Sequence, residues 1–559
     1  MVLLFAPAGI AHAAAGADGK AEAIAEPLKA AVRQLKEAKG KDREAIFAQL
    51  ANAGDARLIP LLDAFRTGLL EDRDGALVIY GSKARVDGRD VYPLLDAFSA
   101  APLTGADGKP QYAEKLPSGK NVLAASRGER KDVSAIVSAL SLNDPDPARR
   151  QAAITEAGDR IDVALLPALK AQLEKDPTGR FATDLKESIA RIELAGADRA
   201  ARVAAARTLG QVGSERAVGS LQRAREANEN AGDAELQSII TAATAKADRY
   251  QRIVKWVKIT FDGLSLTSIL VLLALGLSIV FGLMGVINMA HGEFMMVGAF
   301  TTFVVSNWFK TADGVPGPWF NYYPLAAVPI AFGVSAVVGL ACEWLVVRHL
   351  YGRPLETLLA TWGISLVLIQ TARVAYGDTL SVTPPAWMVG GWEVAHDLIL
   401  PRNRVFIIVF CLLCIVAVWL VVNRTKLGLL LRATTQNREM AAALGVATRR
   451  VDALTFAFGA GLAGLAGVVV PLFDKINPQM GQGYIVDSFM VVVVGGVGKL
   501  AGALVAGAGL GFFSKYLEPL ISGTGAVIYG KIAVLVMVIL FLQWRPAGLF
   551  PPKGRVADA

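Results

Sequence analysis

The chain has 559 residues, of which 53% are apolar, and its 57 lysines and arginines exceed its 49 acidic residues, giving a net charge of +8. A mean hydropathy of +0.43 is typical of a protein with several membrane spans. The apolar residues gather after about residue 255, whereas the preceding residues are rich in Ala and charged side chains, so we expect two domains. Much of the positive charge flanks the apolar segments, where it orients them, which argues against a nucleic-acid partner.

The sequence gives no signal for catalysis or metal binding. Cys342, Cys411 and Cys414 all lie in apolar stretches, so we interpret them as packing residues rather than a metal or redox motif. His12 is the only histidine before His291. We therefore expect that the chain is not an enzyme, that no residue is catalytic, and that no metal is bound.

Residues 1–15 resemble a secretory signal peptide. A short apolar run closes in small residues, with Ala11-His12-Ala13 matching an A-x-A cleavage pattern. No Lys or Arg precedes the run, unlike the basic start of a typical signal. We nevertheless expect export of the region that follows.

Residues 20–250 show helical spacing of apolar positions and two internal echoes. PLLDAF occurs at 60–65 and again at 93–98, and DPARRQAAITEAG at 146–158 matches DRAARVAAARTLG at 198–210. Such echoes predict stacked helix pairs, similar to HEAT-like repeats, that form a soluble α-helical interaction domain. The alternative is that Ala-rich helices resemble one another by chance.

The second half predicts a membrane domain over residues 260–545. Segments shorter than the ~20 residues of a perpendicular span, especially 293–309 and 484–498, are expected to be tilted, broken or re-entrant. The fold class that follows is all-α, a polytopic helix bundle of about 8–9 spans after the soluble repeat domain. The apolar segments are 264–286, 293–309, 325–347, 357–376, 404–422, 451–473, 484–498, 500–517 and 526–543.

Positive charge predicts the orientation of these spans. The loops at 348–356 and 423–450 and the tail at 546–559 carry most of the Arg and Lys residues and should be cytoplasmic. The N-terminal domain is then expected in the periplasm. Arg249, Arg252, Lys255 and Lys258 disagree, since they precede the first span on its outer side.

Polar residues interrupt the apolar run at 276–299. An unpaired polar group in hydrocarbon costs several kcal/mol, so these residues must face other helices, water or a translocation path. The alternative is a helix-packing corner at the membrane surface. We also expect His291 and Glu293 to lie at the cytoplasmic end of the first two spans, where they hold the short second segment against the bundle. The candidate pathway residues are Asn288, His291, Glu293, Thr361, Ser365 and Gln370.

Small residues predict where helices touch. Gly459, Ala463 and Gly467 recur four residues apart and share one helix face, and Gly502 begins a similar stretch. Small residues at this spacing let helix backbones approach closely in a membrane. We expect these four residues to be packing residues.

A partial phosphate-binding motif occurs at 495–499, GGVGK. Val493 stands where the motif requires Gly, and Leu500 stands where it requires Ser or Thr. The chain is therefore not expected to be an ATPase.

Five blocks in order resemble a known family. They resemble the permease subunits of branched-chain amino acid ABC importers and span nearly all of residues 260–555. The region of some 250 residues before them departs from the plain permease and resembles the B-type permease subunit of urea ABC importers. The blocks are GLSIVFGLMGVINMAHGEFMMVGAF (276–300), ATWGISLVLIQ (360–370), TKLGLLLRATTQNREMAAALGVATRRVDALTFAFGAGLAGLAG (425–467), VVVVGGVGKLAGALVAG (491–507) and WRPAGLF (544–550).

The resemblance implies the partners of a bacterial inner-membrane importer. A periplasmic substrate-binding protein, a second permease and two cytoplasmic ATPases are implied, with ATP on the ATPases and no cofactor in this chain. It also implies an ATPase-coupling helix within the loop 423–450, formed by Arg438, Glu439, Met440, Ala441, Ala442, Ala443, Leu444 and Gly445. Helix formers that end on a glycine agree with a short helix, although Met440 departs from the common EAA-type pattern. The alternative is an ordinary basic loop.

The function expected from the sequence is a permease for urea or short-chain amides. The alternative within the class is a branched-chain amino acid permease. The alternative from another class is a membrane-anchored interaction or sensor protein, which nine Gly-rich spans argue against, because an anchor needs only one or two.

Overall fold

The computed structural model describes residues 28–551 except for 29–30, 33, 36–37, 39–40, 54, 74–75, 87–88, 106–109, 118–120, 312–315 and 522–524. The chain divides into two compact units, with the boundary between Gln251 and Arg252. We call them the N-terminal unit and the membrane unit. The predicted signal peptide (1–15) and the last part of the predicted tail (552–559) lie outside the described residues.

The N-terminal unit contains an antiparallel sheet, so the prediction of an all-α fold is wrong for this region. The strand order is β3-β4-β2-β1-β6, with β5 paired to β4, and Leu70 of β1 faces Ile79 of β2. The sheet follows the helices α2 (Lys41–Ala53) and α3 (Ile59–Thr67). Its strands are β1 (Leu70–Arg73), β2 (Ala76–Tyr80), β3 (Ala84–Val86), β4 (Arg89–Asp96), β5 (Tyr112–Ala113) and β6 (Val122–Leu123).

The two copies of PLLDAF adopt different structures. The first copy lies in α3, where Pro60 occupies the first turn. Proline is tolerated there because an N–H group in the first turn has no partner within the helix. The second copy lies mainly in β4, where Pro93 faces Tyr112 of β5. The secondary structure of these six residues is therefore decided by the residues around them in sequence and in space. This echo does not correspond to a structural repeat.

Helices form the rest of the N-terminal unit. The second echo falls at equivalent places in two of them, because Asp146 and Asp198 accept hydrogen bonds from the backbone N–H groups of Ala148 and Ala200, both at 3.0 Å. Each aspartate thereby caps the first turn of its helix, α5 or α8. The helices are α4 (Glu129–Ser141), α5 (Pro147–Arg160), α6 (Leu166–Lys175), α7 (Ala182–Leu194), α8 (Arg199–Val212), α9 (Glu215–Ala231) and the start of α10 (Ala234–Met284).

The aligned glycines of this echo also occupy equivalent positions. A Cβ at Gly158 would lie 2.7 Å from Ser188 Oγ on α7, and a Cβ at Gly210 would lie 2.9 Å from Ala243 Cα on α10. In both cases only glycine allows the second helix along the chain, α7 or α10, to pack so closely. The second echo therefore corresponds to two equivalent helices, whereas a HEAT-like class stays a prediction.

In the membrane unit, each of the nine predicted apolar segments coincides with a helix. Among the described residues, seven helices are long and apolar enough to cross a membrane. α11 and α18, the two segments expected to be short or re-entrant, are not among the seven. After α10 the helices are α11 (His291–Trp308), α12 (Tyr323–Leu345), α13 (Pro354–Tyr376), α14 (Arg402–Arg424), α17 (Thr448–Val469), α18 (Met480–Gly495), α19 (Leu500–Leu517) and α20 (Ala526–Trp544).

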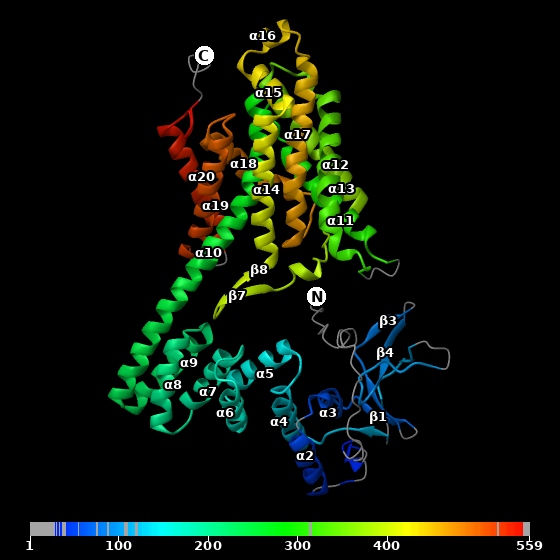
Figure 1. Ribbon diagram of the computed structural model, residues 1–559, viewed down its shortest axis with the longest axis vertical. Coiled ribbons are helices and arrows are strands. Elements are labelled where there is room, and N and C mark those ends of the chain that lie inside the picture. The colour runs from blue at the N-terminus through cyan, green and yellow to red at the C-terminus, as the bar shows by residue number, and fades with distance from the viewer. Residues whose placement is uncertain are drawn as a thin grey trace. The chain divides into compact units, whose positions relative to one another are not determined.

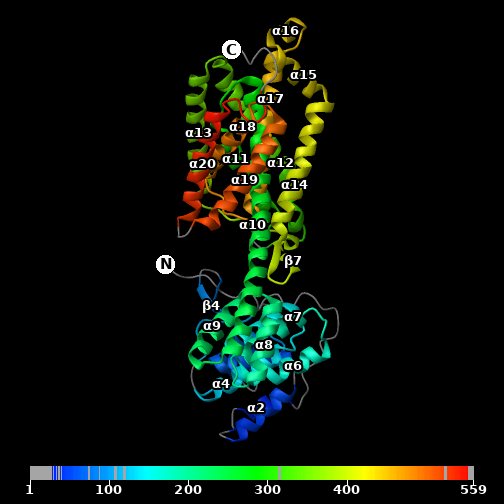
Figure 2. The ribbon, with the colours of Figure 1, turned by 90° about the vertical axis from the view of Figure 1, so that its left-hand side faces the viewer.

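The membrane unit has two distinct ends. The short helices α15 (Lys426–Gln436) and α16 (Arg438–Ala443) lie at one end, and the hairpin of β7 (Gly391–Ala395) and β8 (Leu398–Pro401) lies at the other (Figures 1 and 2). Arg438 of α16 contacts Tyr351, so the basic loops 348–356 and 423–450 share the α15–α16 end.

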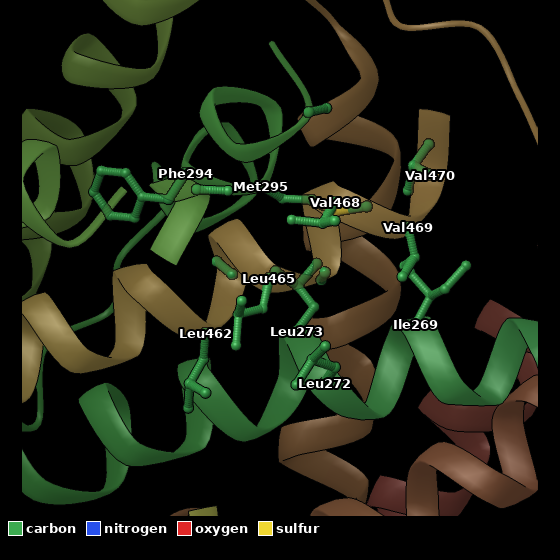
Figure 3. Packing of buried hydrophobic residues seen from close by; sticks show 14 of the residues in the cluster. Ile269, Leu272, Leu273, Phe294, Met295, Leu462, Leu465, Val468, Val469 and Val470 are labelled. Atoms are coloured by element: carbon green, nitrogen blue, oxygen red, sulfur yellow. The ribbon is translucent and has the colours of Figure 1, made fainter. Parts of the chain in front are cut away.

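α17 lies at the centre of the membrane unit. Its most apolar window is 78% buried, against 17% for α14. Figure 3 shows Leu465 and Val468 of α17 gathered with Leu273 of α10 and Met295 of α11. Because lipid tails are as apolar as leucine, this core is stabilised mainly by close van der Waals packing.

Candidate functional site

The chain enters the candidate site through a non-helical segment between α10 and α11. Gly285 has a φ of +64°, which ends α10, and residues 285–290 form no helix. Asn288 Oδ1 accepts a hydrogen bond from the backbone N–H of Ala290 at 3.0 Å. The hydroxyl of Thr361 on α13 accepts one from the N–H of Met289 at 3.1 Å. These bonds fix the turn that leads into α11.

α11 begins deep inside the membrane unit rather than at its end. His291 Nε2 lies 3.2 Å from the carbonyl oxygen of Leu273, and a Cβ at Gly276 would lie 3.0 Å from the same nitrogen. At 1.5 Å per residue, Leu273 lies roughly 16 Å from the end of α10 at Met284. The prediction that His291 and Glu293 lie at the cytoplasmic end of the first two spans is therefore wrong. The prediction rested on segment lengths, which do not show that residues 285–290 run back into the bundle before α11 begins.

Several buried polar atoms of this segment have no hydrogen-bond partner among the described residues. They are Asn288 Nδ2, His291 Nδ1 and both carboxyl oxygens of Glu293. The side chains of His291 and Glu293 are fully buried, and Ser365 of α13 lies beside the carboxyl group of Glu293. Buried polar groups are nearly always hydrogen-bonded, and ionisable groups within membranes usually mark pathways or relays. We define the inner polar cluster as Asn288, His291, Glu293, Thr361 and Ser365.

Gln370 is not part of the inner polar cluster, although the sequence placed it there. Thr361 and Ser365 are four residues apart on the buried face of α13. Gln370 is exposed on another face, where its side-chain oxygen accepts a hydrogen bond from Arg373 at 3.4 Å. The five-residue step from Ser365 carries Gln370 away from the inward face.

α18 begins in the same way as α11. The segment INPQMG at 476–481 matches INMAHG at 287–292. Asn477 Oδ1 accepts a hydrogen bond from the N–H of Gln479 at 3.0 Å, as Asn288 does from Ala290. This second helix start was not predicted from the sequence, although the shared I-N-x-x-x-G spacing marks it.

The two helix starts meet at Gly292 and Gly481. A Cβ at Gly292 would lie 2.8 Å from the carbonyl carbon of Gly481, and a Cβ at Gly481 would lie 2.6 Å from that of Gly292. The N-termini of α11 and α18 thus touch through their backbones. Because helix N-termini carry partial positive charge, this is a region where polar or anionic groups are stabilised.

The helices that flank α11 and the helices that flank α18 form two similar sets that run in opposite directions. α17 and α12 pack antiparallel. Gly464 of α17 meets Ser335 of α12, and Gly339 of α12 meets Ala460 of α17. α10 and α19 make the corresponding antiparallel contact, where Gly507 and Gly511 meet Val271 and Thr267. α10 and α12 run the same way, since α11 returns between them, so α17 runs opposite to α10. The helices α10–α12 and α17–α19 are therefore inverted repeats, and the inner polar cluster lies where they meet.

The predicted packing residues all lie at helix contacts. Gly459 faces Gly276 and Val280 of α10, and Gly467 faces the backbone of α11 at Met295 and Ala299. Ala463, between them, is fully buried. Gly502 packs against the backbone of Gly495, at the turn between α18 and α19.

The predicted coupling segment, residues 438–445, contains the short helix α16. The side chain of Asn437 accepts a hydrogen bond from the N–H of Met440 at 2.9 Å and caps the helix. Gly445 has a φ of +87° and follows the last turn. Glu439, Met440, Ala442, Ala443 and Leu444 are exposed, and Ala441 is buried. The segment thus presents apolar side chains at the basic end of the unit.

Arg438 holds α16 to the helix bundle. Its guanidinium donates to the carboxylate of Asp452 on α17 at 2.5 and 3.4 Å, and it stacks over the ring of Tyr351 at 5.5 Å. Tyr351 donates from its hydroxyl to Glu343 at 3.0 Å. Burial raises the pKa of Tyr351, and the nearby Glu343 and Asp452 raise it further, so the hydroxyl keeps its proton.

A charged cavity of about 390 Å³ lies toward the β7–β8 end of the membrane unit, between α10, α14, α18, α19 and α20. This volume falls within the ~300–1,000 Å³ of ordinary small-molecule pockets. Ion pairs cross it between Arg404 and Asp262 and, at 3.4 Å, between Lys531 and Asp487. Its apolar wall includes Leu266, Ile269, Leu270, Phe473, Val527 and Val534.

Residues 259–542 match a family described as the permease component of the branched-chain amino acid transport system. The chain is similar to the high-affinity branched-chain amino acid transport system permease protein LivH of Escherichia coli, with 29% identity over 301 residues, 52% of this chain and 93% of LivH. BraD of Pseudomonas aeruginosa is 28% identical over 299 residues, 52% of this chain and 93% of BraD. LivM of Escherichia coli is 26% identical over 318 residues, 52% of this chain and 70% of LivM. No solved structure matches the chain.

Proposed function

Since the chain belongs to the family of permease components of branched-chain amino acid transport systems, we propose that it forms part of the translocation pathway of an ATP-driven importer in a bacterial inner membrane. It is a membrane permease component and not itself an enzyme. Its pathway runs beside the inner polar cluster, and a second, related permease completes it. Two cytoplasmic ATPases and a periplasmic binding protein complete the importer.

The observation that carries this proposal is the meeting of α11 and α18 at their N-termini, at mid-depth in the membrane unit. Non-helical backbone at this depth is tolerated only inside protein or beside a water-filled path. In transporters built from inverted repeats, such broken helices form the substrate site at the repeat interface. Asn288, His291 and Glu293 bring to this interface polar atoms that have no partner among the described residues. Asn288 Nδ2 can donate a hydrogen bond to a passing solute, and the carboxylate oxygens of Glu293 can accept one.

For the substrate, we propose a small amino acid with an apolar side chain. The relatives LivH and BraD are named for branched-chain amino acid transport. The charged cavity supports this substrate, since Lys531 and Arg404 suit a carboxylate, Asp474 and Asp487 suit an ammonium group, and the apolar wall suits the side chain. A neutral solute such as urea needs neither set of charges.

Urea or short-chain amides are the second candidate. The observation that favours them is the N-terminal unit, which lies outside the family match that begins at residue 259. A long N-terminal region is the feature by which the sequence resembles urea permeases. We place this unit in the periplasm, where its paired helices contact the binding protein.

Uptake measurements in a deletion strain test the function and separate the two substrates. We expect the strain to lose uptake of labelled leucine, and a plasmid copy of the chain to restore it. Unchanged leucine uptake together with lost urea uptake would select the second candidate. Retention of both uptakes would contradict the proposed function, as would the failure of any ATPase to purify with the chain.

A further inference from the structure

A charged network ties the segment predicted to couple to the ATPase to two long helices. Arg438 at the start of α16 binds Asp452 of α17 and lies over the ring of Tyr351. Tyr351 donates to Glu343 of α12, which also accepts a hydrogen bond from Arg348 at 3.3 Å. We name these five residues the α16 clamp.

Burial makes the α16 clamp different from a surface ion pair. The side chains of Glu343 and Asp452 are 2% and 5% exposed, whereas those of Arg348 and Arg438 are 37% and 45% exposed. Arg438 and Tyr351 link the two carboxylates, since Arg438 binds Asp452 and stacks on Tyr351, which donates to Glu343. Each therefore depends on a cation from the loops, because an uncompensated buried charge is strongly unfavourable. Exposed pairs, by contrast, contribute little.

The clamp continues into a packed path toward the inner polar cluster. Ser335, Gly339 and Glu343 are four residues apart on the buried face of α12. This face packs against α17, where Gly464 allows Ser335 to approach. The hydroxyl of Ser335 donates to the carbonyl oxygen of Phe294 at 3.1 Å. Phe294 follows Glu293, so contiguous packing joins α16 to the inner polar cluster.

We propose that Arg438 is a positioning residue that makes α16 move together with the ends of α12 and α17, so that movement of the ATPases reaches the inner polar cluster. The inference rests on the proposed function, since it assumes that ATPases bind at α16. Separation of α16 from α17 would leave Asp452 buried without a cation. The two elements therefore shift as one body, and α12 follows through Tyr351 and Glu343.

The test uses the full importer, purified with its ATPases and reconstituted in vesicles. In Arg438→Gln and in Asp452→Asn, we expect ATP hydrolysis to stay within about twofold of wild type while substrate uptake falls at least tenfold. The charge exchange Arg438→Asp with Asp452→Arg should recover at least a third of the lost uptake. Arg353→Ala is the matched control at the same end, because the one ion pair of Arg353 among the described residues is with the exposed Glu356, at 3.1 Å.

Three outcomes would overturn the inference. The first is uptake within twofold of wild type in Arg438→Gln. The second is a charge exchange that transports no better than its single variants. The third is loss of the ATPases from the purified Arg438→Gln complex, which would assign Arg438 to docking instead. If the wild-type chain itself binds no ATPase, the proposed function fails, and that result is visible before any variant is compared.

Discussion

Gly292 and Gly481 touch backbone to backbone, and each leaves no room for a side chain on the other. A Cβ at either position would lie within 2.8 Å of the carbonyl carbon of its partner. Since Gly292 and Gly481 are each the second residue of their helix, α11 or α18, this contact joins the two inverted repeats at the inner polar cluster. The absence of a side chain at both positions allows the two helix N-termini to come this close.

We predict that Gly292→Ala and Gly481→Ala each lower stability by about 1–3 kcal/mol, because the new methyl group meets backbone that cannot turn aside. Thermal unfolding of the detergent-purified chain measures the change. Gly483→Ala is the matched control, since a Cβ at Gly483, on the same helix, meets nothing within 4 Å. It should be neutral or slightly stabilising. Equal melting temperatures for all three variants would contradict the close contact.

Glu293→Gln is predicted to lower transport at least tenfold without lowering the melting temperature. The substitution keeps the shape of a fully buried side chain and removes a carboxyl group whose oxygens have no hydrogen-bond partner in the part of the chain that the structure describes. A neutral amide costs less to bury than a carboxylate, so stability should hold or rise. Parallel measurement of uptake and melting temperature separates the two effects. Full transport in this variant would remove Glu293 from the pathway.

The repeated asparagine turns should respond differently to charge. Asn288→Ala and Asn477→Ala each remove a side-chain bond to the backbone and should cost about 1 kcal/mol, the usual value for a lost cap. Asn288→Asp places a charge at a buried position and should cost more than Asn288→Ala. Asn477→Asp should be tolerated, because Asn477 is only half-buried. Unfolding measurements on the four variants test this asymmetry.

Sequence patterns predicted the membrane helices well, since an apolar segment of sufficient length has few other stable structures in a bilayer. They failed where partners far apart in sequence decide the outcome. PLLDAF becomes helix at 60–65 and strand at 93–98 because different neighbours surround it. The depth of His291 depends on the path of residues 285–290, which no periodicity encodes. The inverted repeat shares few residues beyond I-N-x-x-x-G, and the antiparallel contacts of α12 with α17 and of α10 with α19 made it evident.

The candidate site was predicted in part for a related reason. Asn288, His291 and Glu293 stand out in sequence because polar groups are costly in an apolar run. Asn477 has the same role at the start of α18, but it lies in a more polar segment and therefore does not stand out in the sequence. Gln370 was misplaced because the sequence alone did not fix which face of α13 points inward.

Asp233 should give the N-terminal unit an acid-sensitive element. It accepts from the N–H of Leu236 in the first turn of α10, and Arg199 pairs with it at 2.7 Å. The Arg199 guanidinium lowers the pKa of Asp233 to about 2, below its ordinary value of 3.8. The carboxylate therefore contributes stability above about pH 4, and this contribution is lost as the pH falls through 2. Asp233→Asn should melt below wild type at neutral pH, and the difference should vanish toward pH 2. A constant difference would contradict this assignment.

The last prediction concerns Gly445, which closes the coupling segment. Its φ of +87° is available to glycine at little cost, and its N–H donates to the carbonyl oxygen of Ala442 at 3.0 Å. Proline fixes φ near −65° and has no N–H. Gly445→Pro should therefore disrupt α16 and abolish uptake while the chain still inserts in the membrane.

Two companion variants sharpen this prediction. Gly445→Asn should retain most transport, because asparagine tolerates the left-handed region better than other residues. Ala442→Glu, which places a carboxylate on the exposed side of α16, should abolish uptake if this side docks on an ATPase. The readouts are uptake, membrane abundance and recovery of the ATPases with the purified chain. Normal uptake in a well-expressed Gly445→Pro variant would show that α16 does not couple, because no backbone geometry of this turn can accept proline unchanged.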